Sequence, residues 1–469
     1  MTRIHTTSPG APGAPATRPA IDRTFVAPRV CTNSLRMLSV VLAACGPGAV
    51  GFDGDASDTD TTGAPASESG VDATTADPTL EPTTEAAGSS SAASSDSSTG
   101  DAPVCAVERP GKQLLLAQLD PPAAGKMQWT RGLAVDADDV AYVGGALQVD
   151  ATTTPVLVRV AGDGEVLGTH THAPLGPDGS ATSLARAPDG TVYLAGEDPE
   201  GPARGFVAAF APDGAALAGF VLPGDPTRRI AALTTSAEGL LVAGSEDVDL
   251  NFWLTGFTPG GPGAWDRGAA VLGAGAVALA VAPDGRVAAA HGLWNPGPDT
   301  AVEFQRLEAA GASAWSIVEP GVSGPGATWA VAFAADGDVL TLRSHYHDDE
   351  PEVGRVELVA HAVEDGAERW RTTIVSDPKL WVIGHGILVA PTGELRVVYT
   401  QHLLMQGLQQ VGVGVATLSV TGELLGAGVL TDDVLASKME LPQIAGGLGA
   451  CDTLWVWDAR GAELRKFQL

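Results

Sequence analysis

Residues 182–196 read TSLARAPDGTVYLAG, two short apolar runs on either side of Ala-Pro-Asp-Gly. Proline presets φ for the second position of a type I turn, and glycine suits the position that closes it. Because apolar residues alternate with small or polar ones on both sides, the stretch predicts a β-hairpin. The same phrase returns in altered forms at 132–145, 231–244, 278–292, 330–344, 387–400 and, degraded, at 448–458.

Aligned on their turns, the copies lie 46 to 59 residues apart. The aligned turn positions are Asp139, Gly190, Gly239, Gly285, Gly337, Gly393 and Asp452. Each unit carries a second hairpin, as in VLVRVAGDGEVLG at 156–168, so that one unit makes a four-stranded antiparallel sheet. Sheets that are apolar on both faces bury them by packing around an axis. The sequence therefore predicts an all-β fold with almost no helix: a seven-bladed β-propeller of four-stranded antiparallel blades.

The composition agrees with many short elements joined by tight turns. The 469 residues include 59 Gly and 33 Pro, and only 5% of them are aromatic. The net charge is −29, and residues 104–469 carry 22 basic against 44 acidic side chains. A domain that acidic repels phosphate backbones, so we expect no nucleic-acid partner.

An export signal precedes the repeats. The apolar run from Met37 to Ala44 is too short to span a bilayer and is typical of a secretory signal. Its end, Leu42-Ala43-Ala44-Cys45, resembles the lipobox of bacterial lipoproteins. The resemblance implies that Cys45 carries a diacylglycerol lipid, of the palmitate kind, and anchors the mature chain to a membrane. A chance cysteine after an apolar run is the alternative.

The same residues predict where in the cell the mature chain is located. The chain would lie in the cell envelope, at the periplasmic face or the cell surface. The residue after the lipidated cysteine is Gly46, not the aspartate that is linked to inner-membrane retention of lipoproteins, so the outer membrane is preferred. We expect translation to begin at Val26 or Val30, with residues 1–29 preceding the true start.

Residues 52–103 hold 11 acidic side chains, no basic ones and almost no large aliphatics. Such a segment cannot bury enough surface to offset its chain entropy, which predicts a disordered tether. The expected organisation is a signal region at 1–44, the lipidated cysteine with an acidic Ser/Thr/Asp-rich linker at 45–103, and the propeller at 104–469.

The last repeat is one strand short of four, and KQLLLAQL at 112–119, before the first full unit, could supply that strand. Such a mixed sheet would close the ring. It would also bring Cys105 near Cys451, the two cysteines left once Cys31 departs with the signal and Cys45 takes lipid. In an oxidising compartment this predicts a disulfide that locks the closure, with two unpaired thiols as the alternative.

Tryptophans follow the second turn of three units, as in AVEDGAERWRTT at 362–373. Together with LLVAGSEDVDLNFWLTGFTPGG at 240–261, they resemble the repeats of secreted bacterial propellers of the PQQ-like, quinoprotein type. The resemblance implies that Trp265, Trp315 and Trp370 dock neighbouring blades against each other, rather than forming a ligand cage.

Catalytic signatures of the common hydrolases, metalloproteases and nucleotide-binding enzymes are mostly absent, and the one Gly-x-Gly-x-x-Gly, at Gly46, Gly48 and Gly51, lies in the linker with no strand before it. The best polar cluster is HYHDDE at 345–350, where His345 and His347 would share one face of a strand and could meet one metal. His170 and His172 have the same spacing with fewer acids. We interpret both as solvated polar segments, and we predict no catalytic residue, no cofactor and no metal site.

Two classes of function stay open. The favoured one is a non-catalytic binding or scaffold module, monomeric and membrane-tethered through Cys45, that holds a protein or small-molecule ligand at the rim. The alternative is a periplasmic enzyme of the quinoprotein or propeller-hydrolase kind, which needs convergent polar side chains in the channel or on the rim. The expected inner strands instead read as small and apolar, as in ALAVA at 278–282 and AVAFA at 330–334.

Overall fold

The computed structural model describes most of the repeat region. The described residues are 109–121, 125–150, 152–174, 179–197, 205–221, 229–236, 241–246, 251–258, 263–272, 277–293, 301–320, 330–345, 354–377, 380–405, 408–431 and 444–469. The predicted signal region, Cys45, the linker and Cys105 lie outside them. In the described residues the only helical element is the short 3₁₀ turn η1 (Ala450–Asp452), and no helix there is long and apolar enough to cross a membrane.

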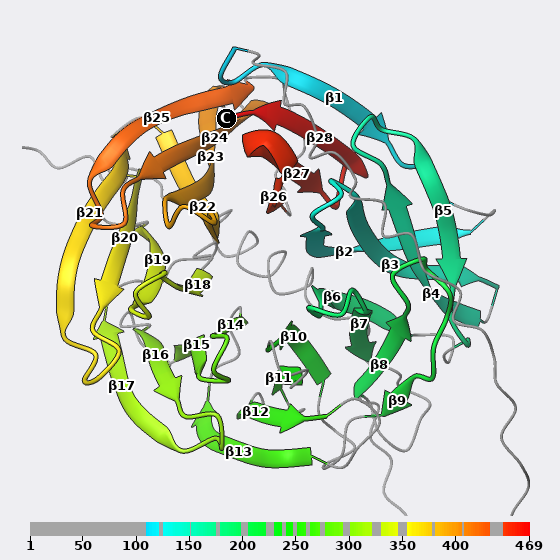
Figure 1. Ribbon diagram of the computed structural model, residues 1–469, viewed down its shortest axis with the longest axis horizontal. Helices are drawn as coiled ribbons and strands as arrows, with labels where there is room; N and C mark the ends of the chain where they lie inside the picture. The colour runs from blue at the N-terminus through cyan, green and yellow to red at the C-terminus, as the bar shows by residue number, and fades with distance from the viewer. Residues whose placement is uncertain are drawn as a thin grey trace, which may run out of the picture. The chain divides into compact units, whose positions relative to one another are not determined.

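Seven antiparallel sheets stand around a central axis, each with one strand near the axis and one at the periphery (Figure 1). The innermost strands are β2 (Lys126–Val135), β6 (Ser180–Arg186), β10 (Arg229–Thr235), β14 (Val277–Val281), β18 (Ala330–Phe333), β22 (Leu380–Val389) and β26 (Ile444–Gly449). The second strands are β3 (Ala141–Val149), β7 (Val192–Glu197), β11 (Leu241–Glu246), β15 (Val287–Leu293), β19 (Val339–His345), β23 (Leu395–Met405) and β27 (Thr453–Asp458). The all-β propeller architecture with four-stranded antiparallel sheets is therefore as predicted.

The remaining strands complete each sheet outward. The third strands are β4 (Thr152–Val160), β8 (Gly205–Phe210), β12 (Asn251–Phe257), β16 (Ala301–Leu307), β20 (Gly354–His361), β24 (Leu408–Leu418) and β28 (Glu463–Gln468). The outer strands are β5 (Val166–Thr171), β9 (Phe220–Val221), β13 (Gly263–Leu272), β17 (Ser313–Pro320), β21 (Glu368–Asp377), β25 (Leu424–Thr431) and β1 (Gln113–Gln118).

The repeated phrase forms the hairpin between the first and second strands. At the quoted stretch, Ala187 N–H donates to Thr191 O at 2.8 Å and Gly190 N–H donates to Ala187 O at 2.9 Å. Gly190 has φ of 88°, in the left-handed region that only glycine adopts without strain. Asp139 takes the equivalent position in the first sheet with φ of 63°. The turn therefore repeats because each sheet needs the same tight reversal.

The predicted count of seven complete blades is wrong. Six of the sheets have four strands of at least four residues, whereas β9, the outer strand of the β6–β9 sheet, has only two. Before β9 the chain keeps only isolated contacts with β8: Leu217 N–H donates to Ala209 O at 2.8 Å, while Leu217 O accepts from His172 Nε2, just after β5 of the neighbouring sheet, at 2.8 Å. The imidazole also lies close over Gly219, where a Cβ would be 2.6 Å from its ring. Regular pairing resumes only at Phe220, and the described residues end at Val221. The described part of the chain therefore forms six full blades and one sheet with a short outer strand.

The predicted closure by the N-terminal strand is confirmed. β1 pairs antiparallel with β28, and the sheet runs in the order β1-β28-β27-β26. The segment before β1 is also held to the chain end, because Gly111 N–H donates to Gln468 O at 2.7 Å and Gln468 N–H donates to Lys112 O at 3.0 Å. A strand from one end of the repeat region thus completes the sheet at its other end, which ties the ring shut.

Side chains reinforce this closure across the joint between the last sheet and the first. Trp455 Nε1 donates to Asp139 Oδ1 at 2.8 Å, and Asp139 Oδ2 forms an ion pair with Lys466. Trp457 Nε1 donates to Thr130 O at 2.9 Å, and its ring meets Trp129 edge-on with centroids 5.3 Å apart. Both Trp455 and Trp457 are fully buried, so burial of large rings and satisfied indole N–H groups stabilise the joint together.

The core is a series of apolar layers between adjacent sheets. One layer joins the β18–β21 and β22–β25 sheets and includes Leu340, Leu342, Leu358, Val397 and Tyr399, all fully buried. Equivalent layers fill the other joints. Each sheet thus uses both faces for packing, which explains the short, doubly apolar strands of the sequence.

Candidate functional site: a buried ion-pair network in the β18–β21 blade

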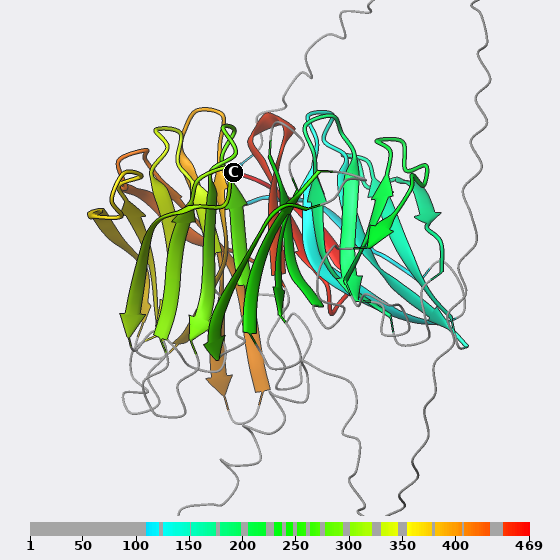
Figure 2. The same cartoon turned by 90° about the horizontal axis from the view of Figure 1, so that it is seen from below.

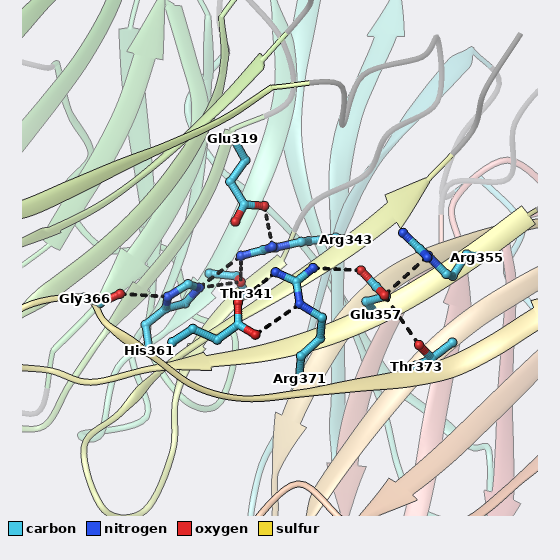
Figure 3. Close-up of polar contacts among 10 residues, drawn as sticks. Glu319, Thr341, Arg343, Arg355, Glu357, His361, Gly366, Arg371 and Thr373 are labelled. Carbon is cyan, nitrogen blue, oxygen red and sulfur yellow. Dashed lines mark hydrogen bonds and ion pairs between the residues drawn. The ribbon is translucent and has the colours of Figure 1, made fainter. Parts of the chain in front are cut away.

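The β18–β21 blade differs on its two faces. Leu340, Leu342 and Leu358 face the β22–β25 sheet and are apolar. The intervening residues face the preceding sheet and are polar: Thr341, Arg343, Glu357 and His361 are all at least 96% buried. Cross-strand pairing sets Arg343 opposite Glu357, so alternation along β19 and β20 gathers these groups on one face. Figure 3 shows the resulting network.

Arg343 lies at the centre of this network and is fully buried. Its Nη1 forms an ion pair with Glu319 of β17, in the preceding sheet, and its guanidinium lies over the Phe304 ring at 5.2 Å. Its Nη2 donates to Thr341 Oγ1 at 3.3 Å and lies 3.1 Å from His361 Nε2. Burial lowers the pKa of the Arg343 guanidinium and Glu319 raises it, and arginine stays charged throughout the physiological range. A buried cation is therefore matched by a carboxylate from the next sheet.

His361 is held as a neutral imidazole. Its Nδ1 lies 3.0 Å from Gly366 O, which can only accept, so Nδ1 carries the proton and Nε2 accepts from Arg343. Burial lowers the pKa of His361, and the charge of Arg343 lowers it further. The ring thus links the central guanidinium to the β20–β21 turn. In this environment it serves as a hydrogen-bonding brace rather than as a proton-transfer group.

The network continues outward through Glu357 and Arg371. Glu357 Oε2 accepts from Arg371 Nη1 at 3.0 Å, and its Oε1 forms an ion pair with Arg355 Nε at 3.3 Å. Arg371 also donates two hydrogen bonds to Glu368, from Nε to Oε1 at 3.2 Å and from Nη2 to Oε2 at 2.8 Å. These hydrogen bonds raise the pKa of Arg371 and lower that of Glu368. Three arginines and three glutamates therefore balance in charge from the blade interior to its surface.

The network lies on the hairpin that carries the best polar cluster of the sequence. His345 is the last residue of β19 and pairs in register with Arg355, but its side chain and residues 346–353 lie outside the described part. The interpretation of His345 and His347 therefore lies outside the described residues and stays a prediction. Across the described residues, no group of three or more His, Cys, Asp or Glu side chains is arranged to hold a metal.

A second polar chain joins β22 and β23, with Thr400 and His402 fully buried and His385 half-buried. His385 Nε2 lies 2.8 Å from Thr400 Oγ1, which lies 3.0 Å from His402 Nε2. Burial lowers the pKa of His385 to about 3, with further contributions from His402 and Arg131, and burial lowers the pKa of His402 to about 4. Sequence reasoning missed both histidines. The signal was the Gly-His-Gly stretch at 384–386, where the β22–β23 register shifts by one residue.

The other predicted residues lie apart from these networks. His172 and His170 contact the incomplete sheet, His170 against Gly214 and His172 against Leu217 and Phe210. Cys451 lies in η1, where its carbonyl accepts from Gln468 Nε2 at 3.0 Å. With Cys105 outside the described residues, the predicted disulfide stays a prediction.

Two of the three tryptophans have described side chains, and both meet the following sheet. Trp315 is buried and its Nε1 donates to Val363 O, in the β20–β21 turn, at 3.1 Å. Trp370 lies against Gly422 in the β24–β25 turn, where a Cβ would be 2.4 Å from the indole. The side chain of Trp265 lies outside the described part.

No protein family model matches the chain, and no curated protein matches it. Solved structures that are similar include AofleA from Arthrobotrys oligospora (10% identity, TM-score 0.40, 65% of this chain and 86% of that one). Polysaccharide lyase Uly1 is 12% identical with a TM-score of 0.45, over 72% of this chain and 90% of that one. Quinohemoprotein alcohol dehydrogenase from Comamonas testosteroni is 9% identical with a TM-score of 0.37, over 74% and 67%. Likenesses this distant carry no argument about activity. The chain's own strand order makes it a β-propeller protein.

Proposed function

We propose that this protein is an exported, lipid-anchored β-propeller that binds a partner, without catalysis, at one end of its ring. The strands of each sheet alternate in direction, so the first and third connections lie at one end and the others at the opposite end (Figure 2). We call these the turn end and the loop end.

The proposal rests on the lengths of the connections between strands, which differ between the two ends of the ring. At the turn end, the first connection has five residues in six of the sheets. At the loop end, the connection between the second and third strands ranges from two residues, as at 406–407, to eight, at 346–353. Apart from the nine-residue connection at 211–219, the turn end is the more uniform of the two, and varied connections on a rigid scaffold are where proteins place binding residues.

The buried network supports a binding role for the longest connection between a second and a third strand. Residues 346–353 join β19 to β20, the two strands that the Arg343–Glu357 network fixes against the neighbouring sheet. Holding both strands rigid lowers the entropy that a loop between them loses when a ligand binds. Its His, Asp and Glu side chains favour a polar or cationic ligand over an anionic one.

The address rests on the Leu42-Ala43-Ala44-Cys45 motif and on the acidic segment that follows it. A long, self-repelling linker would hold the ring away from the membrane and leave its loop end accessible. Mass spectrometry of the mature N-terminus tests this directly. We expect a diacylated Cys45 as the first residue; an unmodified N-terminus upstream of residue 45 would overturn the anchor.

The disulfide between Cys105 and Cys451 belongs to the same proposal, since it needs an oxidising compartment. The segment from residue 109 runs beside the chain end at Gln468, and Gln468 in turn donates to the Cys451 carbonyl. Cys105 is four residues before that segment, so a short stretch of chain suffices for the bridge.

The enzyme alternative makes a different prediction for the purified protein. A quinoprotein or metal-dependent hydrolase would retain a chromophore or a stoichiometric ion. Absorption spectroscopy and elemental analysis of the protein isolated from its own cells decide between them. We expect neither; one bound quinone or metal per chain would overturn the non-catalytic proposal.

A further inference from the structure

Four of the innermost strands in the described part of the ring have a bulge at the same place. The register with the second strand shifts around Arg131 in β2, Thr182 in β6, Ala231 in β10 and His385 in β22. Each of these residues comes eight positions before the aligned turn residue of its own repeat. The four bulges therefore mark equivalent positions at one level along the axis of the propeller.

A bulge in an innermost strand displaces its extra residue towards the axis, because the strand has its partner on the outer side. Solvent exposure agrees with this direction, since Arg131 and Ala231 are exposed and the other two residues are half-buried. Thr182 Oγ1 donates to Ile230 O, next to Ala231 in the following sheet, at 2.6 Å. Neighbouring positions of this level are therefore in contact around the axis.

The two ionisable residues of this level belong to sheets that flank the last sheet. Figure 1 shows the innermost strand of that sheet, β26, between β22 and β2. At Gly446 of β26 a Cβ would be 2.8 Å from Val398 in the β22–β25 sheet. At Gly447 it would be 2.6 Å from Val135 of β2. The two glycines therefore let the flanking sheets approach each other closely.

Arg131 and His385 present complementary groups at this place. The positive charge of Arg131 lowers the pKa of His385, so the two side chains are close enough to interact. His385 directs Nε2 to Thr400 Oγ1, at 2.8 Å, which leaves Nδ1 for a ligand. A guanidinium fork offers paired N–H donors to an oxyanion, and an imidazole nitrogen beside it can add another donor.

We propose that the axis of the propeller has a site for one small oxyanion, such as a carboxylate, sulfate or phosphate group, bound by Arg131 and His385 beside the glycines of β26. This site goes beyond binding at the loop end and does not depend on it, because its residues lie on β2 and β22. Residues 104–469 have 44 acidic and 22 basic side chains, so the propeller as a whole repels anions. We therefore expect millimolar affinity.

Equilibrium dialysis of the full chain with radiolabelled sulfate tests the proposal, with Cys45→Ser to remove the lipid and chloride to hold the ionic strength constant. We expect one sulfate per chain and a dissociation constant of about 1 mM. Arg131→Gln should weaken binding at least about tenfold and His385→Ala about fivefold, because each removes donors to the anion. Lys126→Gln, the same loss of charge at an exposed residue of the same strand, is the matched control and should bind as the parent chain does.

Ala231→Glu tests whether the four positions share one level, because it adds a negative charge there from a different sheet. It should weaken sulfate binding, whereas Ala335→Glu, the same change in an exposed turn, should not. Absence of saturable binding by the parent chain, or binding that Arg131→Gln leaves unchanged, would overturn the proposal. Equal losses for Arg131→Gln and Lys126→Gln, or for the two glutamate variants, would overturn it as well. Circular dichroism should show that all variants keep the parent fold.

Discussion

Asp139, in the first hairpin turn, accepts a hydrogen bond from Trp455, which lies 316 positions later in the chain, at 2.8 Å. The same carboxylate neutralises Lys466, whose side chain is only 9% exposed. In most other turns of this kind glycine holds the left-handed position, but here an aspartate does, and its side chain crosses the joint between the last sheet and the first. One residue thus shapes a local turn and ties the two ends of the ring.

We expect Asp139→Asn to destabilise the protein by about 3 kcal/mol, because it leaves a buried ammonium group without its counter-charge. Asparagine tolerates the same backbone conformation and can still accept from Trp455, so the loss reports the ion pair. Urea unfolding measures it. Asp163→Asn, at an exposed turn position, is the control and should change the free energy of unfolding by less than about 0.5 kcal/mol. Equal effects of the two changes would contradict the role of Asp139.

The Arg343–Glu319 pair should show a coupling energy in a double-mutant cycle with Arg343→Met and Glu319→Gln. We expect at least about 2 kcal/mol, because the guanidinium is fully buried and the pair joins two sheets. Arg371 and Glu368, a more exposed pair of the same network, provide the comparison and should couple by about 0.5 kcal/mol. If the two cycles give the same value, the buried pair does not hold the sheets together.

Stability should fall as the pH decreases below 6.5. His402 is fully buried with a pKa lowered to about 4, so at intermediate pH the unfolded chain binds a proton that the folded chain does not. Its contribution is complete above the unfolded pKa near 6.5 and is lost progressively towards pH 4. Urea unfolding at pH 7 and pH 5 should differ by about 2 kcal/mol from this residue. His402→Gln should reduce the difference by that amount, and an unchanged difference would contradict it.

The predicted disulfide should appear in peptide mapping under non-reducing conditions as one peptide pair containing Cys105 and Cys451. Cys451→Ser should then lower the free energy of unfolding by about 2–4 kcal/mol, because the bridge closes a very long loop. Recovery of both cysteines as free thiols from freshly isolated protein would contradict the prediction.

The repeat pattern made most of the fold predictable. Pro-Asp-Gly turns with alternating apolar flanks fixed the hairpins, and a last unit with too few strands pointed to closure by β1. The short outer strand of the described β6–β9 sheet was not predictable, because the contact of His172 Nε2 with Leu217 O comes from another sheet and leaves no local pattern in the sequence. Local sequence still reads there as an ordinary Ala-Pro-Asp-Gly hairpin. A count of turns therefore gives the number of repeats but not the number of complete blades.

The candidate site was only partly predictable. The histidines of HYHDDE are close in sequence, whereas the network beneath them joins residues of four strands in two sheets. Thr341, Arg343, Glu357 and His361 alternate with leucine, valine and alanine, which is the pattern of a half-polar strand face. That alternation was visible. The sequence did not indicate that this polar face packs towards Glu319 of the preceding sheet instead of facing solvent.

Binding at the loop end is tested most directly by replacing residues 346–353 with an Asn-Gly turn in the full-length Cys45→Ser chain. The measured quantity is the apparent dissociation constant of the labelled protein for cell envelopes of the cells that produce it. Glu364→Lys, an exposed position at the turn end, is the matched control. We predict at least tenfold weaker binding for the loop replacement and no change for Glu364→Lys, with both variants folded by circular dichroism. Undiminished binding after the loop replacement, or a loss confined to Glu364→Lys, would contradict the account.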